Sequence, residues 1–139
     1  MPYDSGGLEI LDPEECRTLL AKVPLGRIVF THRALPAVQP VNFILDGGDV
    51  VIRTGEGSKL AAAARNAIVA FEADDFDADA RTGWSVVVIG PARVVSDPEE
   101  TARLRDLPLR PWAPGRREAF IRIRPALISG RRTPETLPT

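Results

Sequence analysis

One segment near the middle of the chain combines residue types that suit the binding of a phosphate group. A β-branched stretch delivers Arg53 and Thr54 to the glycine-bounded loop 55–57. A short helix is then expected to begin at Ser58 and Lys59. The first N–H groups of a helix and its positive dipole end attract anions, and the guanidinium, hydroxyl and ammonium groups add directed donors. The segment therefore predicts a phosphate site, unless Ser58 only caps the helix and both cations are solvated.

The spacing of this segment differs from that of a P-loop. Lys59 follows a serine, and no Ser or Thr comes directly after it to hold magnesium. The segment is therefore not a Walker P-loop.

Other residues that could bind a ligand or a metal, or act in catalysis, are weaker candidates for a functional site. Trp84 opens an apolar strand, where an indole either packs or contacts a planar ring. The acidic run 75–79 lacks the glycine and the distal glutamate of a calcium loop, so we interpret it as a solvated turn. Cys16 falls on the apolar face of a predicted helix and is interpreted as core, and the lone loop residue His32 receives no catalytic role. The sequence thus predicts no metal site and names no catalytic residue.

Arginines gather near the C-terminus. Arg122 and Arg124 alternate with isoleucines, so they are expected on one face of a strand. Arg131 and Arg132 follow a few residues later. Such a face is usually solvated, but an anionic group of a substrate or cofactor is a second candidate for its partner.

Composition narrows the class of protein. The 139 residues, 44% hydrophobic and 27% charged, predict a single soluble domain over 1–139, with 1–8 and 133–139 flexible. A net charge of −1 argues against nucleic acid as a partner. The longest uncharged run, 34–45, is shorter than the roughly 18 residues of a membrane helix, so we expect no membrane. A single cysteine and the absence of a signal-peptide pattern favour the cytoplasm.

Three short helices are expected, and each begins with a capping residue. Asp12, Ser58 and Asp97 are good N-caps, and a proline follows two of them. The predicted helices are 13–23, 58–66 and 98–104.

The remaining apolar patterns predict a mainly β scaffold. Pro40 lies inside the second strand, which is therefore expected to be an edge strand or to bulge there. The run 86–89 predicts a strand that is buried on both faces. Short connections between the strands favour a closed antiparallel barrel. The predicted strands are 27–31, 37–45, 50–54, 68–73, 84–95 and 119–124.

A set of motifs that are weak one by one becomes specific in its order and spacing. They are Gly26-Arg27-Ile28-Val29-Phe30, Pro40-Val41-Asn42-Phe43, Arg53-Thr54-Gly55-Glu56-Gly57-Ser58-Lys59-Leu60, Val69-Ala70-Phe71-Glu72-Ala73-Asp74 and Gly83-Trp84-Ser85-Val86-Val87-Val88-Ile89-Gly90. Together they resemble the pyridoxamine 5′-phosphate oxidase-like family, the flavin-binding split β-barrels, and the ending up to Arg132 resembles a small uncharacterised branch of it. The resemblance implies a six-stranded antiparallel Greek-key split barrel, a homodimer, and FMN in the groove between subunits.

The resemblance also implies which residues bind the cofactor. The FMN phosphate and ribityl chain would be held by Arg53, Thr54, Ser58 and Lys59. Because the interior of a six-stranded barrel is filled by its own side chains, a flavin must lie outside, against the barrel wall. A second subunit across a two-fold axis would enclose its other face.

The flavin ring has its own implied residues. Val41 and Asn42 would lie along the isoalloxazine. Trp84 and Ser85 would belong to the same pocket, from the same chain or across from the second subunit.

The implied function is that of an FMN-dependent oxidoreductase with a small-molecule substrate that the sequence does not name. The flavin would carry the chemistry and the protein would position it. The substrate-binding segment at the C-terminus of the vitamin-processing oxidase is not found, so oxidation of pyridoxine phosphate is not expected. Two alternatives stay open, namely a reductase that uses a deazaflavin coenzyme, whose oligoglutamate tail would suit the basic C-terminus, and a non-catalytic flavin-binding protein.

Overall fold

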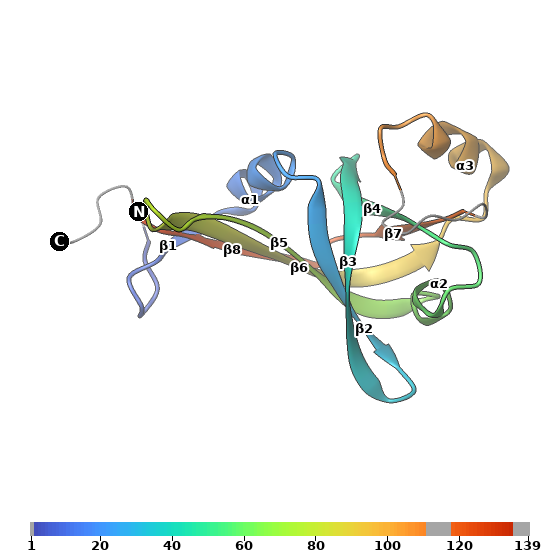
Figure 1. The fold of residues 1–139 in the computed structure, drawn as a ribbon, viewed down its shortest axis with the longest axis horizontal. Coiled ribbons are helices and arrows are strands. Elements are labelled where there is room, and N and C mark those ends of the chain that lie inside the picture. The colour runs from blue at the N-terminus through green and yellow to red at the C-terminus, as the bar shows by residue number, and fades with distance from the viewer. Residues whose placement is uncertain (1, 111–117, 135–139) are drawn as a thin grey trace.

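Eight β-strands form one continuous antiparallel sheet in the computed structural model, which describes residues 2–110 and 118–134 (Figure 1). The strands are β1 (Glu9–Leu11), β2 (Leu25–His32), β3 (Leu35–Asp46), β4 (Asp49–Thr54), β5 (Ala67–Asp77), β6 (Thr82–Val94), β7 (Ala119–Ile123) and β8 (Leu127–Arg132). The helices are α1 (Pro13–Leu20), α2 (Lys59–Ala63) and α3 (Pro98–Arg105).

The sheet closes on itself as a six-stranded barrel, which confirms the predicted fold class. The order β6-β5-β2-β3-β4-β7 closes because the end of β6, Ala92–Val94, also pairs with β7. The earlier part of β6, Trp84–Ile89, pairs with β8 instead. One long strand therefore belongs to the barrel at one end and to a sheet extension at the other. β1 pairs with the outer edge of β8, and neither of these two strands was among the six that the sequence predicts.

All three predicted caps begin their helices. The side chains of Asp12, Ser58 and Asp97 accept hydrogen bonds from backbone N–H groups three residues later, at 2.8, 3.0 and 3.2 Å. The first two helices end earlier than predicted, at Leu20 and Ala63. After Leu20 the chain closes its last turn with bonds to the carbonyl three residues back, a tighter arrangement that leads into Pro24.

Proline at position 40 fits because its strand is locally an edge. β3 pairs with β2 over Leu35–Asn42, but it pairs with β4 only from Phe43 onward. Pro40 therefore has a strand on one side only, as its missing N–H requires. The predicted edge position is confirmed.

The apolar run Val86–Ile89 is buried on one face only, so the prediction of burial on both faces is wrong. Val86 and Val88 are buried in the barrel core. Val87 is only partly buried and Ile89 is 37% exposed. The acidic run also differs from the predicted loop, because β5 continues to Asp77 and only the residues after it form the turn.

The barrel core consists of alternate residues from every barrel strand. Phe71 lies at its centre, fully buried, with its ring edge-on to Phe43 at a centroid distance of 4.7 Å. Gly26 faces this ring, and a Cβ there would collide with it. Each buried aromatic or branched side chain of this kind stabilises the fold by about 2 kcal/mol. No helix in the described part of the chain is long and apolar enough to cross a membrane.

The segments at the two chain ends were predicted to be flexible. Residues 4–8 make a turn before β1, in which the Asp4 carboxylate accepts the N–H groups of Gly6 and Leu8. The predicted flexible C-terminal segment lies outside the described residues from position 135 onward.

Candidate functional site

The strand-to-helix corner after β4 brings together three of the predicted phosphate ligands. The Thr54 and Ser58 hydroxyl oxygens are 3.5 Å apart. The backbone N–H groups of Lys59 and Leu60 open the helix and have no intrahelical acceptor. The Lys59 side chain is exposed and has no carboxylate partner among the described residues. Thr54, Ser58 and Lys59, here called the phosphate corner, thus offer two hydroxyls, free N–H groups and one cation.

The guanidinium of Arg53, predicted to be a fourth ligand, is bonded largely to protein groups. It donates to the carbonyl oxygen of Leu109 at 3.0 Å and to the carboxylate of Glu118. It also lies over the Phe120 ring, 5.6 Å from the centroid. Its Nε is buried and has no hydrogen-bond partner among the described residues. Arg53 thus uses two of its five N–H groups on the protein, and it serves mainly to hold residues 107–109 against β4.

Of the two residues predicted to lie along a ring, one is accessible. The Asn42 amide donates to the carbonyl oxygen of Arg110 at 3.3 Å. It lines a groove of about 470 Å³ with Arg53 and residues 107–110. Val41 is 1% exposed and faces the barrel core. A ring outside the barrel would meet only the backbone of Val41, because successive side chains of a strand point to opposite faces.

The other two predicted residues, Trp84 and Ser85, line a pocket of about 310 Å³ near the tip of the β5–β6 hairpin. Its further walls include Phe76 and Arg131, and we call this the tryptophan pocket. Phe76 is 67% exposed. Sequence reasoning missed Phe76, although an aromatic residue between aspartates is a signal of unusual exposure. The pocket offers aromatic surfaces beside a cation.

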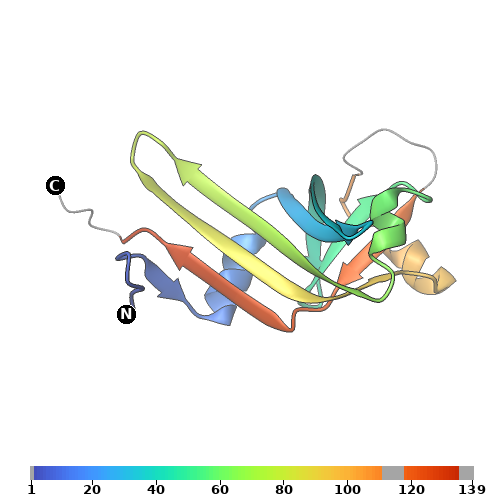
Figure 2. The ribbon, with the colours of Figure 1, turned by 90° about the horizontal axis from the view of Figure 1, so that it is seen from below.

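The phosphate corner and the tryptophan pocket lie at opposite ends of the folded molecule. Figure 2 shows the β5–β6 hairpin extending away from the barrel, while α2 lies at the far side. The part of β6 from Trp84 to Ala92 is about 26 Å long at the usual rise per residue. Ala92 lies opposite Ile123 of β7, which lies opposite Val50 of β4, and β4 continues from there away from Trp84. One chain does not bring the two sets together.

The C-terminal arginines are largely paired with acids of the same chain. Arg132 donates to Glu9 at 2.8 Å and to Glu15 at 3.3 Å. Arg131 forms an ion pair with Asp4 at 3.3 Å. These contacts hold β1 and the N-terminal turn against β8.

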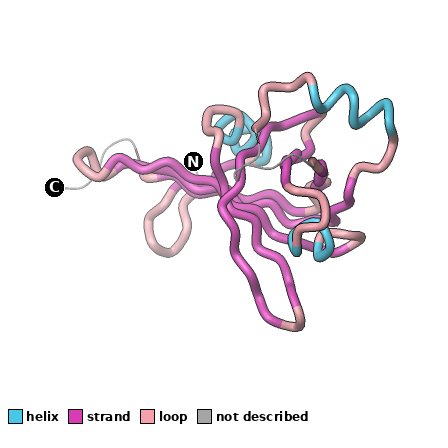
Figure 3. The backbone as a smooth tube through the Cα atoms, turned by 45° about the vertical axis from the view of Figure 1, so that its right-hand side comes forward, coloured by secondary structure: helices cyan, strands magenta, loops and turns pink. Residues whose placement is uncertain are grey.

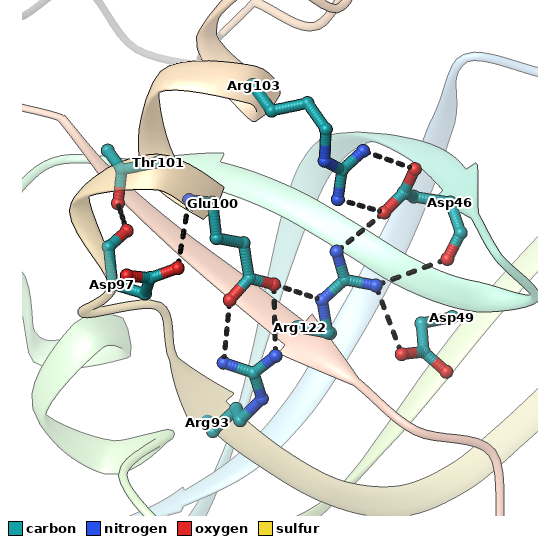
Figure 4. A network of polar contacts seen from close by, with 8 residues as sticks. All are labelled: Asp46, Asp49, Arg93, Asp97, Glu100, Thr101, Arg103 and Arg122. Atoms are coloured by element: carbon teal, nitrogen blue, oxygen red, sulfur yellow. Dashed lines mark hydrogen bonds and ion pairs between the residues drawn. The ribbon is translucent and has the colours of Figure 1, made fainter.

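Arg122 is not on a solvated face, so that expectation is wrong. It is 8% exposed and donates to Asp46, Asp49 and Glu100 at 2.6–3.1 Å (Figure 4). The alternation predicted which side chains share this face, but α3 covers the part of it at Arg122. The charge of Arg122 is therefore neutralised within the fold and is not offered to a ligand.

A row of apolar side chains crosses the outer face of the sheet on the side without a helix. Leu127 lies opposite Ile89, Ile89 opposite Ala70, Ala70 opposite Val29, and Val29 opposite Val38. Cross-strand partners share a face. Leu127, Ile68 and Val38 are 64–66% exposed. We call this row, with Ile68, the bare face. Contiguous apolar surface of this kind marks an interaction site.

Thiol chemistry is not available at Cys16. Its side chain is fully buried against Gly130. Burial raises the pKa of the Cys16 thiol, which keeps it protonated. The interpretation of Cys16 as a core residue is confirmed.

Comparisons with known proteins agree with this architecture. The uncharacterized protein Rv0080 of Mycobacterium tuberculosis is 46% identical over 125 residues, which are 86% of this chain and 82% of that protein. The structure of the FAD binding protein from Mycobacterium smegmatis is 42% identical, with a TM-score of 0.78, over 91% of this chain and 100% of that one. A Corynebacterium glutamicum structure, provisionally classed as a pyridoxamine 5′-phosphate oxidase, is 39% identical with a TM-score of 0.81, over 91% and 92%.

A family model described as pyridoxamine 5′-phosphate oxidase matches residues 12–132. This range runs from the cap of α1 to the last residue of β8 and so includes the whole barrel, the phosphate corner and most of the tryptophan pocket. The chain therefore belongs to the pyridoxamine 5′-phosphate oxidase family.

Proposed function

We propose that the protein is a cytoplasmic homodimer that binds a flavin nucleotide, FMN in the first instance, and acts as an oxidoreductase on a small molecule. The phosphate corner carries this proposal, because it offers an exposed ammonium, two hydroxyls and free helix N–H groups at one place. Such donors suit a doubly charged phosphate ester. Family membership and the likeness to a flavin protein support it.

A bound flavin would supply hydride or electron transfer at its ring. The chain's own residues bind and shield it. Thr54, Ser58 and Lys59 would hold its phosphate, and Asn42 and Trp84 would contact its ring system. Arg53 lines this groove, and its terminal nitrogens keep N–H groups beyond those bonded to Leu109 and Glu118.

The homodimer is proposed because the two halves of the site lie too far apart on one chain. The corner and the tryptophan pocket are separated by more than the length of a flavin ring system. A two-fold axis would place the pocket of one subunit beside the corner of the other. The bare face supplies the apolar surface that such an association would bury.

Flavin titration with two lysine variants tests the phosphate corner. Lys59→Ala removes a charge-assisted phosphate contact of about 2 kcal/mol, so the FMN dissociation constant should rise about thirtyfold. Lys22→Ala removes the other lysine of the chain, which is exposed near the end of α1, and should leave it unchanged. Quenching of flavin fluorescence reports both. An unchanged affinity in the Lys59 variant refutes the site.

Mixing two inactive variants tests the shared site. Lys59→Ala damages the corner and Trp84→Ala the pocket, so each homodimer should bind FMN poorly. In an equilibrated mixture half of the dimers are mixed, and each of these has one site with both halves intact. About a quarter of the wild-type sites should return. No recovery in a mixture shown to contain heterodimers excludes a site shared between subunits, and sedimentation as a monomer excludes the homodimer itself.

FAD is the second candidate cofactor, because the Mycobacterium smegmatis protein with 42% identity is an FAD binding protein. Parallel titrations with FMN, FAD and a deazaflavin coenzyme rank the three. Turnover with nicotinamide reductants and candidate acceptors then separates an oxidoreductase from a protein that only stores or carries a flavin.

A further inference from the structure

A second basic hollow lies on the barrel wall at the other end of α2. Two hollows of about 490 and 480 Å³ share Asn66 and Arg93 as walls, so they form one continuous groove. Arg65 and Ser96 line one part of it, and Arg124, Arg122 and Asp49 line the other. We call it the arginine groove, defined by Arg65, Asn66, Arg93, Ser96 and Arg124. It shares no residue with the phosphate corner or the tryptophan pocket.

Three separate elements bring these arginines together. Arg65 follows α2, Arg93 belongs to β6, and Arg124 follows β7. The backbone of Arg124 lies against β6 because its N–H donates to the Pro91 carbonyl at 3.1 Å. Gly90 permits this approach, since a Cβ there would collide with the Arg124 carbonyl. The position of Arg124 is therefore fixed by the backbone and not only by its side chain.

The charges around the groove do not balance. Arg93 forms a bidentate contact with Glu100 at 3.0 and 3.2 Å, and Arg122 uses the same carboxylate and those of Asp46 and Asp49. Arg65 and Arg124 are exposed and have no carboxylate partner among the described residues. Asp49 also lines the groove, but its carboxylate is paired with Arg122 at 3.1 Å. The charges of Arg65 and Arg124 therefore remain without a paired carboxylate among the described residues.

The neutral polar groups of the groove are also available. The side chains of Asn66 and Ser96 make no hydrogen bond to another group within the described parts of the chain. Glu100 holds Arg93 in place and is itself held by Arg122. Each terminal nitrogen of Arg93 spends one N–H on Glu100 and keeps a second one, so Arg93 is positioned before any ligand arrives. Pro91, Ala92 and Val94 supply apolar wall beside these donors.

We propose that the arginine groove binds a small phosphate ester, with its dianionic phosphate between Arg65, Arg93 and Arg124 and its organic part against the apolar wall. Planar guanidinium forks match phosphate oxygens. Two uncompensated charges match a dianion, and the volume suits a small metabolite. This site is additional to the proposed flavin site and does not depend on it.

Titration with inorganic phosphate and pyrophosphate at low salt tests the groove, with the backbone amide signals of Asn66 and Ser96 as the readout. Wild-type protein should saturate at millimolar or lower concentrations. Arg65→Gln/Arg124→Gln removes both uncompensated charges and should weaken pyrophosphate binding about a hundredfold, since each lost charge-assisted contact costs about tenfold. Arg17→Gln/Lys22→Gln, on the exposed side of α1, removes the same charge elsewhere and should change it less than twofold.

Two cross-checks with variants already described separate this proposal from the flavin site. Lys59→Ala should leave the shifts at Asn66 and Ser96 intact, while the groove variant should bind FMN as the wild type does. No shift in the wild type, an undiminished affinity in the groove variant, or an equal loss in the α1 variant would overturn the groove. Failure of flavin binding alone would not affect it.

Discussion

The two outer faces of the barrel are built from similar apolar strands but differ in what covers them. On one face, α3 and residues 107–109 cover β4 and β7, so Val51, Leu104 and Phe120 are at most 1% exposed. On the bare face none of the three described helices lies over the sheet, and Leu127 and Val38 are exposed to solvent. The chain thus supplies its own cover for one face only. The difference suggests that the second face is completed by another molecule, which we propose is a second copy.

The arginines of the two faces show the same difference. Arg122 lies under α3 among three carboxylates with a side chain 9% exposed. Arg27 lies on the bare side with Glu72 and Asp74, and its side chain is 45% exposed. A buried arginine is held by complete neutralisation, whereas an exposed one contributes little because water competes for it.

The largest expected effect is the loss of Arg122. Arg122→Gln removes a buried cation, leaves Asp49 without an arginine partner, and takes from Asp46 and Glu100 one of the two arginines that each contacts. It should lower the free energy of unfolding by about 3–5 kcal/mol. Arg27→Gln should lower it by less than about 1 kcal/mol. Urea unfolding of both, at a protein concentration low enough to keep the chain monomeric, measures the contrast. Equal losses of unfolding free energy in the two variants would contradict the difference between the buried and the exposed arginine.

A pair of leucine variants tests the same difference between the covered face and the bare face. Leu104→Ala opens a cavity under α3 and should cost about 2–4 kcal/mol of stability. Leu127→Ala on the bare face should change the stability of the monomer by less than about 0.5 kcal/mol. It should instead raise the dimer dissociation constant about tenfold, measured by sedimentation. Unchanged self-association of the Leu127 variant contradicts a dimer through this face.

Acid should lower the free energy of unfolding through the carboxylates on the covered face. Hydrogen bonds from Arg103 and then Arg122 hold the pKa of Asp46 well below its usual range, and Arg93 lowers the pKa of Glu100. Near pH 4 these two carboxyl groups therefore bind protons in the unfolded chain but not in the folded one. Their contribution to the free energy of unfolding is complete above about pH 4 to 5 and is lost as the pH falls further. Urea midpoints from pH 7 to 3 should fall more steeply for wild type than for Arg122→Gln. Parallel curves would show that this network does not set the acid sensitivity.

The smallest effect concerns the β2–β3 hairpin, which extends away from the rest of the barrel (Figure 3). Its turn residues Arg33 and Ala34 have φ values of 52° and 65°, a region that disfavours side chains. Ala34→Gly should stabilise the protein by about 1 kcal/mol. Gly47→Ala, at φ 60° in the β3–β4 turn, should destabilise it by about the same amount. Thermal unfolding distinguishes the two signs, and a loss of stability in Ala34→Gly would show that the turn is not strained.

The sequence alone predicted the local elements and the barrel. The side chains of Asp12, Ser58 and Asp97 cap helices through bonds that span only three residues, so their pattern is visible in a short window. The phosphate corner is local for the same reason, since Thr54, Ser58 and Lys59 lie within one strand-to-helix turn. The six barrel strands follow from apolar alternation and short connections.

Tertiary structure decided what lies over each strand. Arg122 and Arg124 alternate in the same way, yet α3 buries the first and leaves the second at an open groove, because the cover comes from a segment some twenty residues earlier in the chain. Likewise the apolar run Val86–Ile89 predicts burial on both faces, but Ile89 is 37% exposed because no element among the described residues covers it. Periodicity reports which side chains share a face. Which face meets solvent, a helix or another subunit depends on contacts between residues distant in sequence, and no local pattern encodes them.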